Sequence, residues 1–426
     1  MRQETVAVHA QDTGDAPPAR RGGRMPWAVY MLAAGTFLMG TTEFVVAGLL
    51  PEIADDLGVG VARTGLLITV FAVGMIVGAP LMTLLTLRIP RRVTLLLALG
   101  VFALGHVVVA VGTGFPLLLA ARFATALATG AFWSVASVVA TRAAGPGATA
   151  RALALVGSGG MLANVVGVPL GAFIGQVMGW RGPFWVLAAL AAAAAVLIAR
   201  AVPADGPNRR EVSVRTELAG LGSTGLWWAL AACATTTGGV LSTYSYIAPL
   251  LTGRAGIAAS LVPLVLVGFG IGALAGTVSG GRLGDARPHA TTIAAAGSTT
   301  AVLLALCLLS GTTWLVVALV AVLGFVGLGA NPILSSFAVR FAEQAPTLAV
   351  ALTVSAFNLG TALGTPLAGR ALDSGLGTLG PAAVGAAISA LTLLPTIALA
   401  TGRRRRPADA ARGTDATGPH ARGRTS

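Results

Sequence analysis

The sequence predicts an all-α membrane protein whose twelve transmembrane helices form two pseudo-symmetric six-helix halves. Three observations lead to this prediction. Of the 426 residues, 55% are apolar and only 10% are charged, against roughly a quarter charged in an ordinary soluble domain. The chain also contains twelve apolar segments of about the 20 residues that a transmembrane helix requires. Finally, a polar stretch near the middle of the chain divides these segments six and six.

The apolar segments are continuous and are joined mostly by short turns rich in Gly, Pro and Arg. Continuous runs favour helices, because the strands of a membrane β-barrel would alternate apolar and polar residues. The expected spans are 27–49, 64–86, 93–113, 116–140, 151–175, 183–200, 227–251, 261–281, 290–310, 313–338, 347–369 and 381–401. We therefore expect a disordered cytoplasmic tail (1–25), an N-terminal half (26–200), a central cytoplasmic loop (201–226), a C-terminal half (227–401) and a second disordered cytoplasmic tail (402–426).

The positions of the basic residues predict the orientation. All 28 are Arg, and the formal net charge is +13. With the N-terminus in the cytoplasm, 23 Arg residues lie in cytoplasmic loops and tails, four lie outside, and Arg122 lies within a span. Because cytoplasmic loops carry an excess of basic residues, we expect a multi-pass protein of the cell membrane with both termini inside. The same distribution argues against nucleic acid as a partner, because the Arg residues face one lipid leaflet.

Short elements recur about 198 residues apart along the chain. Gly-Val-Pro-Leu at 167–170 matches Gly-Thr-Pro-Leu at 364–367, and Arg142 after the fourth span matches Arg340 after the tenth. Two parallel six-helix repeats are a common layout of membrane transporters. The common offset therefore predicts that the second half repeats the first.

Glycines recur every fourth residue in the second, fifth, eighth and eleventh spans. Small residues at this spacing let helices approach closely. These spans are equivalent under the repeat, so we expect the glycines at the contact between two moving halves; ordinary helix packing is the alternative. They are Gly74, Gly78, Gly167, Gly171, Gly175, Gly268, Gly272, Gly276, Gly280, Gly360 and Gly364.

Several local motifs resemble those of a known family. The segments are GTTEFVVAGLLPEIADDLGV (40–59), FAVGMIVGAPL (71–81), RFATALATGAF (122–132), GVPLGAFIGQVMGWRGPFW (167–185) and TYSYIAPLL (243–251). Together with the layout they resemble the major facilitator superfamily, its twelve-spanner drug:proton antiporters, and more narrowly the actinobacterial chloramphenicol-efflux branch. The resemblance covers about 25–400. In the resembling antiporters the fifth span seals the contact between the halves against leak, which implies this role for Gly167, Pro169, Gly171 and Gly175.

One superfamily signature is incomplete. The pattern G-x-L-a-D-R-x-G-R-R between the second and third spans reads TLLTLRIPRR here (83–92), with Leu87 at the acidic position. The second-half copy keeps its acid, in Gly-Arg-Leu-Gly-Asp at 281–285. By the repeat, Arg340 is the natural partner of Asp285; the alternative is that Asp285 simply faces solvent. The residues expected at a cytoplasmic gate are Arg88, Arg91, Arg92, Asp285 and Arg340.

Two charges lie inside expected spans. Glu43 is the one acidic residue of the 15 that does so, and an ionisable group in a membrane costs about 2.5–3.5 kcal/mol on insertion scales and marks a proton or substrate path. We expect Glu43 to carry a proton or anchor substrate, against a purely structural role. Arg122 lies at a similar depth, so an ion pair that breaks when Glu43 is protonated is one expectation. In the alternative, Arg122 binds backbone carbonyls and only braces its helix.

Polar and aromatic side chains in the spans predict a cavity suited to an amphipathic small molecule. For a single Thr the alternative is a hydroxyl group that bonds its own helix. His106 is a weaker candidate for a proton relay, because a lone His among Val and Leu is more often packed. The expected cavity residues are Thr36, Thr42, Trp133, Asn164, Tyr244, Tyr246, Asn331 and Asn358.

These observations and the resemblance together predict proton-coupled efflux of a drug by alternating access. The resemblance implies chloramphenicol or a related amphenicol; the alternatives are an exporter of sugars or other metabolites and an uncoupled facilitator. The sequence contains no nucleotide-binding loop or nucleophile triad, so we expect a transporter that is not an enzyme. We expect no metal and no cofactor, a proton gradient as energy source, protons, drug and lipid as partners, and a monomer.

Overall fold

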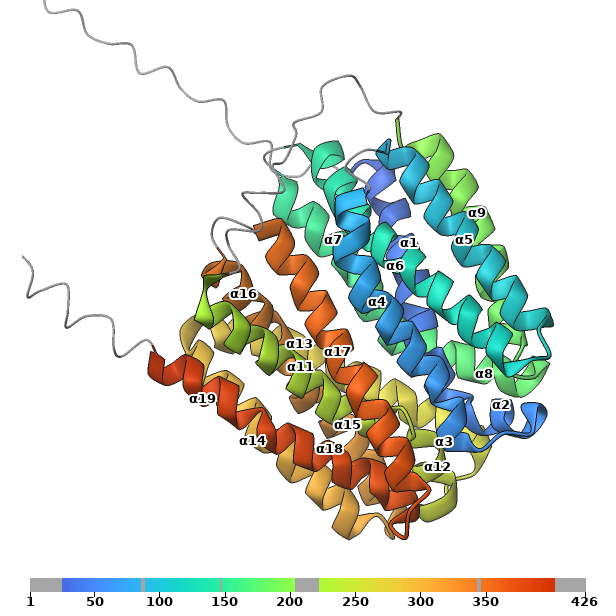
Figure 1. Cartoon of the computed structure of the whole chain (residues 1–426), viewed down its shortest axis with the longest axis vertical. Coiled ribbons are helices and arrows are strands. Elements are labelled where there is room, and N and C mark those ends of the chain that lie inside the picture. The colour runs from blue at the N-terminus through green and yellow to red at the C-terminus, as the bar shows by residue number, and fades with distance from the viewer. Residues whose placement is uncertain (1–24, 86–88, 146–147, 204–221, 343–345, 403–426) are drawn as a thin grey trace, which may run out of the picture.

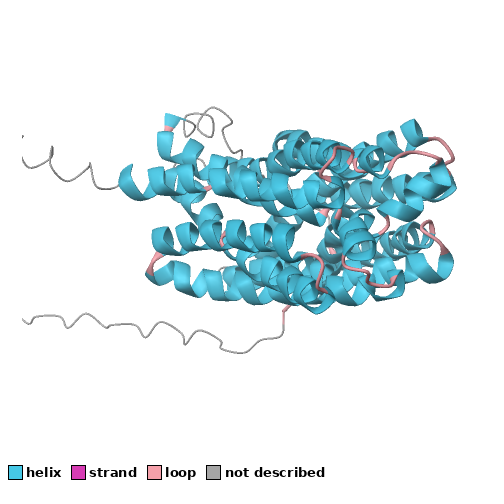
Figure 2. Cartoon of the chain, turned by 90° about the horizontal axis from the view of Figure 1, so that it is seen from below, coloured by secondary structure: helices cyan, strands magenta, loops and turns pink. Residues whose placement is uncertain are grey.

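The computed structural model describes residues 25–85, 89–145, 148–203, 222–342 and 346–402. The expected tails and most of the central loop fall outside these residues. The described part of the chain is almost wholly helical and holds no strand (Figures 1 and 2). This agrees with the predicted all-α membrane fold.

The N-terminal half contains six long helical segments, of which the fifth is interrupted. Its elements are α1 (Trp27–Val45), η1 (Val46–Gly48), α2 (Leu50–Leu57), α3 (Val61–Thr64), α4 (Leu66–Leu85), α5 (Arg91–Val111), α6 (Phe115–Ala144), α7 (Thr149–Leu162), η3 (Ala163–Gly167), α8 (Val168–Met178) and α9 (Gly182–Ala201). The π-helical turn η3 joins α7 to α8 and precedes Pro169, whose missing N–H group cannot continue a regular helix. The fifth span is therefore α7, η3 and α8 together.

The C-terminal half repeats this arrangement. Its elements are α11 (Thr224–Tyr244), α12 (Ile247–Pro249), η5 (Leu250–Arg254), η6 (Ala259–Leu261), α13 (Val262–Ala286), α14 (Pro288–Leu309), α15 (Thr313–Gly329), α16 (Asn331–Phe341), α17 (Pro346–Leu372), η7 (Gly377–Leu379), α18 (Gly380–Leu391) and α19 (Leu393–Gly402). Helices α15 and α16 form the tenth span, and α18 and α19 form the twelfth.

Eleven helices of the described residues are long and apolar enough to cross a membrane. They correspond to eleven of the twelve expected spans. The remaining one, expected at 227–251, corresponds to α11, in which Thr and Gly lower the apolar content. Its 21 residues cover about 31 Å at 1.5 Å per residue, and it packs along α17 and α18. Helix α11 therefore runs through the bundle with its neighbours, but it ends at Tyr244, earlier than expected.

The two halves repeat each other in their internal packing. In the N-terminal half α1 packs on α7 and α4 packs on α6; in the C-terminal half α11 packs on α17 and α13 packs on α15. The glycine stripes lie at these contacts. A Cβ atom on Gly171 would meet Val45 of α1, and one on Gly276 would meet the backbone of Phe325 in α15.

The placement of the stripes differs from the expectation that they face the other half. Gly74 and Gly78 lie against α6, Gly167 against α1, Gly272 and Gly280 against α15, and Gly360 and Gly364 against α11. Gly175 lies against Leu49, which follows α1 and η1 in the chain. Each of these contacts is within one half. Small residues let helix backbones approach closely, so the stripes hold each half together as a unit.

The helices at the contact between the halves are nevertheless the predicted ones. Helix α4 packs on α17, and η3 and α8 pack on α13, so the second, fifth, eighth and eleventh spans meet. Side-chain hydrogen bonds also cross this contact. The Ser355 hydroxyl donates to the carbonyl oxygen of Ile76 (3.0 Å), and the Gln176 amide donates to that of Ala259 (2.6 Å).

Among the residues that the structure describes, the buried apolar side chains of the two halves share one core at one end and form separate cores at the other. At the end that holds α2, α3 and α12, here called the far end, one core contains residues of both halves, such as Leu50 and Leu266. At the opposite end, where α1 begins and α19 ends (Figure 1), two separate cores occur. One contains Leu99 and other residues of the N-terminal half alone, and the other contains Leu334 and residues of the C-terminal half alone. We call this the terminus end.

Candidate functional site

Glu43 lies near the end of α1, inside a described span. Its side chain is half-buried, whereas Thr42 directly before it and Val45 two residues after it are wholly buried. Within the described part of the chain, no hydrogen bond or ion pair holds its carboxylate, although the charges of Glu43 and Arg122 act on each other. The carboxylate is therefore free to exchange partners.

Arg122 is held by groups from two other helices. Its side chain is 1% exposed. Nη1 donates to the carbonyl oxygen of Thr42 (3.0 Å) and to its hydroxyl oxygen (2.9 Å), and Nε donates to the carbonyl oxygen of Leu67 (3.4 Å). The guanidinium carbon lies 4.2 Å from the centre of the Phe71 ring. In this structure Arg122 thus binds Thr42, the residue beside Glu43, and not the Glu43 carboxylate. This arrangement resembles the alternative prediction, in which Arg122 binds backbone carbonyl groups.

Thr42 and His106 complete this arrangement. The Thr42 hydroxyl lies 2.7 Å from Nε2 of His106, and Nδ1 of His106 lies 2.7 Å from the carbonyl oxygen of Phe102. Both side chains are buried. Thr42, expected to line the cavity, therefore lies between Arg122 and His106. No spacing within one helix predicts this contact, because it joins α1, α5 and α6.

Three other expected cavity residues of the N-terminal half lie at contacts between helices. Thr36 is fully buried and donates to the carbonyl oxygen of Val156 in α7 (2.7 Å). Trp133 is half-buried, lies next to Gly160 of α7, and its indole N–H has no partner among the described residues. Asn164 lies in the π-helical turn η3, where its backbone contacts Gly270 of the other half. Such turns are frequent at functional sites.

The four expected cavity residues of the C-terminal half are divided between two environments. Tyr244 stacks on Phe269 with ring centres 4.2 Å apart, and its hydroxyl group is buried without a partner in the described structure. Asn331 begins α16, and its side-chain oxygen is likewise buried and unpartnered. The Asn358 amide donates to the carbonyl oxygen of Val354 in its own helix. Tyr246 instead lies at the far end, where its hydroxyl group contacts Ala62 of α3 and lies beside Gly65.

The expected gate residues lie at the terminus end. Arg88 falls outside the described residues, and Arg91 and Arg92 begin α5 and are half-buried. Asp285 and Arg340 are both exposed, near the ends of α13 and α16, and no ion pair between them occurs in the described structure. Both belong to the C-terminal half, so a bond between them would join α13 to α16 and not one half to the other.

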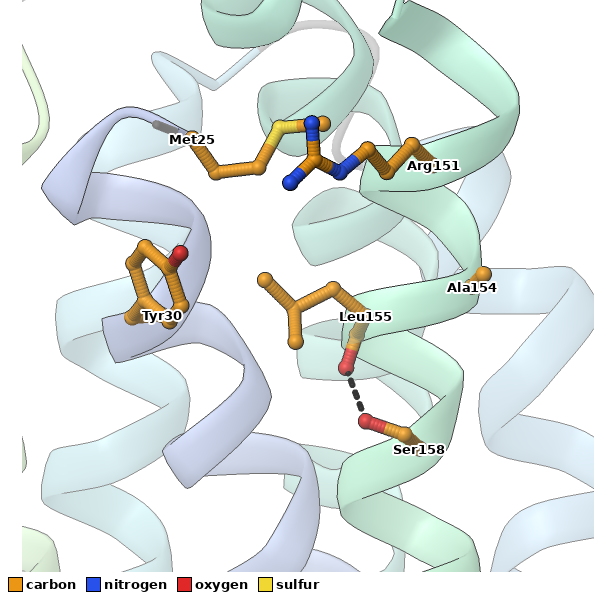
Figure 3. Close-up of a pocket in the computed structure, with 6 residues that line it drawn as sticks. All are labelled: Met25, Tyr30, Arg151, Ala154, Leu155 and Ser158. Atoms are coloured by element: carbon orange, nitrogen blue, oxygen red, sulfur yellow. Dashed lines mark hydrogen bonds between the residues drawn. The ribbon is translucent and has the colours of Figure 1, made fainter. Parts of the chain in front are cut away.

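A cavity of about 330 Å³ opens between α1 and α7 near the terminus end (Figure 3). Figure 3 shows the Arg151 side chain reaching from α7 toward Met25, with Tyr30 and Leu155 below them. Ser158 donates to the carbonyl oxygen of Leu155 (2.7 Å). None of the expected cavity residues lines this space.

Comparisons with known proteins add an independent line of evidence. Residues 32–364 match the family described as the Major Facilitator Superfamily. The chain is 37% identical to a chloramphenicol resistance protein of Streptomyces lividans over 374 residues, which cover 87% of this chain and 95% of that protein. It is 34% identical to the inner membrane transport protein YdhP of Escherichia coli O157:H7 (87% and 95% covered). It is 29% identical to a probable sugar efflux transporter of Mannheimia succiniciproducens (86% and 92% covered).

Proposed function

The chain belongs to the Major Facilitator Superfamily of membrane transporters, and we propose that it exports small amphipathic drugs of the chloramphenicol type in exchange for protons. In this proposal the protein lies in the cell membrane with its termini in the cytoplasm, and its export activity makes the host resistant to the drug. The substrate class comes from the relative in Streptomyces lividans. The sugar efflux relative supports the rival substrate class at lower identity.

The proposed proton coupling rests on one observation, the carboxyl group of Glu43 inside a membrane-spanning helix. A carboxyl group inside a membrane-spanning helix marks a proton or substrate path. Its carboxylate has no hydrogen-bond or ion-pair partner in the described structure and lies within the influence of the buried Arg122. Binding a proton removes the charge of Glu43, and releasing it restores an anion next to a cation. The two forms therefore favour different arrangements around α1, which is what an exchanger needs.

The two ends of the bundle fit alternating access. The halves share a core at the far end and have separate cores at the terminus end. With the termini in the cytoplasm, this arrangement loads drug from the cytoplasm or the inner leaflet. Proton binding from outside then requires the opposite arrangement, in which the far end has opened.

The proposal is tested by drug-induced proton movement in vesicles that contain the purified protein and a pH-sensitive dye. Chloramphenicol should release protons from wild type, and Glu43→Gln should lose this response at least about tenfold, because a neutral amide cannot exchange a proton. Glu52→Gln, which removes a carboxyl group outside the spans, is the control and should retain the response. Proton release by Glu43→Gln equal to that of wild type would refute the coupling.

A panel of substrates separates the remaining alternatives. Export of amphenicols by wild type, with no export of sugars, supports the proposed substrate class. Export of sugars alone contradicts it. Drug export without any proton movement would make the protein an uncoupled facilitator.

A further inference from the structure

Three buried side chains of the N-terminal half form one chain of hydrogen bonds. His106 of α5, Thr42 of α1 and Arg122 of α6 are linked in this order by contacts of 2.7 Å and 2.9 Å. All three side chains are at most 1% exposed. The chain begins at the carbonyl oxygen of Phe102 and ends at the one cation buried in a described span. It thus connects a histidine on α5 to the charge that acts on Glu43.

The direction of every bond follows from Phe102. A carbonyl oxygen can only accept, so Nδ1 of His106 carries the proton and donates it. In a neutral imidazole Nε2 is then an acceptor, and the Thr42 hydroxyl must donate to it. The same hydroxyl oxygen accepts from Nη1 of Arg122. A charged imidazole would donate from Nε2 as well, which would leave the Thr42 proton without an acceptor in this chain.

The position of the imidazole ring is fixed by its neighbours. Its centre lies 4.0 Å from that of the Phe102 ring and 5.9 Å from that of Phe184. A ring held between aromatic groups and bonded at both nitrogens has little freedom to turn. His106 therefore presents Nε2 to Thr42 in a constant direction.

The same bonds leave one part of Arg122 unengaged. Nη1 is bound to Thr42, Nε is bound to Leu67, and the flat face of the guanidinium lies on Phe71. Nη2 is buried and has no hydrogen-bond partner among the described residues. A buried hydrogen-bond donor without a partner costs free energy. We therefore expect Nη2 to gain an acceptor in another conformational state of the transporter.

We propose that His106 is a positioning residue, which acts through Thr42 to hold Arg122 so that Nη2 remains available to Glu43 or to the substrate. This inference rests on the proposed function, because it names how the cation next to Glu43 is kept in place. It assigns no proton transfer to His106. The imidazole stays neutral and orients the Thr42 hydroxyl.

Transport assays on matched variants test the proposal. Thr42→Val keeps the branched shape of the side chain and His106→Phe keeps a flat ring, but each breaks the chain of hydrogen bonds. Each should lower drug-dependent proton release about tenfold, because the bond that positions the charged Arg122 is lost or no longer oriented. Thr42→Ser keeps the hydroxyl group and should retain most of the activity. The double variant should be no worse than either single one, because both remove the same interaction.

Thr125→Val is the matched control. Thr125 is equally buried on α6, but its hydroxyl group bonds the backbone carbonyl of Arg122 (2.9 Å) and not the guanidinium. This variant should keep its activity. The proposal is overturned if Thr125→Val or Thr42→Ser is damaged as much as Thr42→Val, or if the two single defects multiply in the double variant.

A spectroscopic measurement tests the chain without any transport. The protein has four His residues, and the ¹⁵N signals of His106 are identified by their loss in His106→Phe. Wild type should show a neutral imidazole protonated at Nδ1, with Nε2 accepting a bond that Thr42→Val removes and Thr125→Val keeps. A charged His106, or one protonated at Nε2 alone, overturns the proposal. A wild type that moves no protons with drug would refute the proposed function instead, while leaving this result intact.

Discussion

The hydroxyl group of Tyr246 crosses from the C-terminal half to the N-terminal half and donates a hydrogen bond to the carbonyl oxygen of Ala62 (3.2 Å). Gly65 in one half and Gly369 in the other leave room for it, because a Cβ atom on either glycine would collide with the Tyr246 hydroxyl. The ring is 1% exposed. Tyr246 is therefore part of the contact that closes the far end.

Removing this hydroxyl group should weaken the closed far end. A typical hydrogen bond contributes about 0.5–1.5 kcal/mol, so Tyr246→Phe should raise the population open at the far end by about two- to tenfold. The measurement is the distance distribution between spin labels at positions 60 and 374, on the far end of each half, after Cys233 and Cys307 are replaced. Tyr30→Phe removes the hydroxyl group of an exposed tyrosine elsewhere and should change nothing. Unchanged distances in Tyr246→Phe would contradict a role in closure.

Close packing within each half predicts an effect on stability. A Cβ atom on Gly276 would collide with the backbone of Phe325, and backbone atoms cannot move aside as a flexible side chain does. Gly276→Ala should therefore lower the stability by about 1–3 kcal/mol, the usual effect of overpacking, as measured by thermal unfolding in detergent.

Gly268 of the same helix is the control for this prediction. A Cβ atom there would lie 3.7 Å from that of Ala321, an ordinary contact. Gly268→Ala should leave the melting temperature unchanged or raise it slightly, since alanine favours a helix. Equal losses in both variants would show that α13 tolerates no substitution, whatever its packing.

The sequence is sufficient to predict the fold because bilayer thickness and charge asymmetry act on short stretches of chain. Each span needs about 20 apolar residues, and the match between Pro169 and Pro366 can be found by comparing the two halves of the sequence. The neighbours of each helix cannot be found in this way. The face that Gly171 presents depends on the rotation of its helix about its own axis, and the stripe rule gives closeness without naming the partner. The sequence therefore predicts which helices form the contact between the two halves. It does not predict that their glycines pack against helices of the same half.

The candidate site divides in the same way. Glu43 and Arg122 stand out in the sequence because charges inside spans are rare. The sequence does not show that Arg122 binds Thr42 and not Glu43. This contact depends on side chains from three helices that come together only in the folded protein. Tyr246 lies at the far end and not among the cavity residues because α11 ends at Tyr244, and Tyr246 belongs to the turn between α11 and α12. A span boundary is the least certain feature of a sequence-based prediction.

Glu52, outside the spans on α2, predicts a dependence of stability on pH. It is half-buried, and its Oε2 atom is buried without a hydrogen-bond partner in the described structure. Burial raises the pKa of this carboxyl group; nearby Asp55 raises it further, and a hydrogen bond from the backbone amide of Glu52 itself opposes the rise.

The folded protein consequently binds the Glu52 proton more tightly than the unfolded chain does. Stability from this group is fully present below the ordinary pKa of about 4.5 and is lost as the pH rises through the higher value of the folded state. Glu52→Gln cannot ionise, so it should melt at a higher temperature than wild type at about pH 8, and the difference should shrink as the pH falls toward about 5. Melting curves in detergent at both pH values measure this difference.

Asp373→Asn, which removes an exposed carboxylate from the same end, reports the effect of net charge alone. A gain of the same size in that variant, or a gain in Glu52→Gln that does not change with pH, would contradict the assignment to burial.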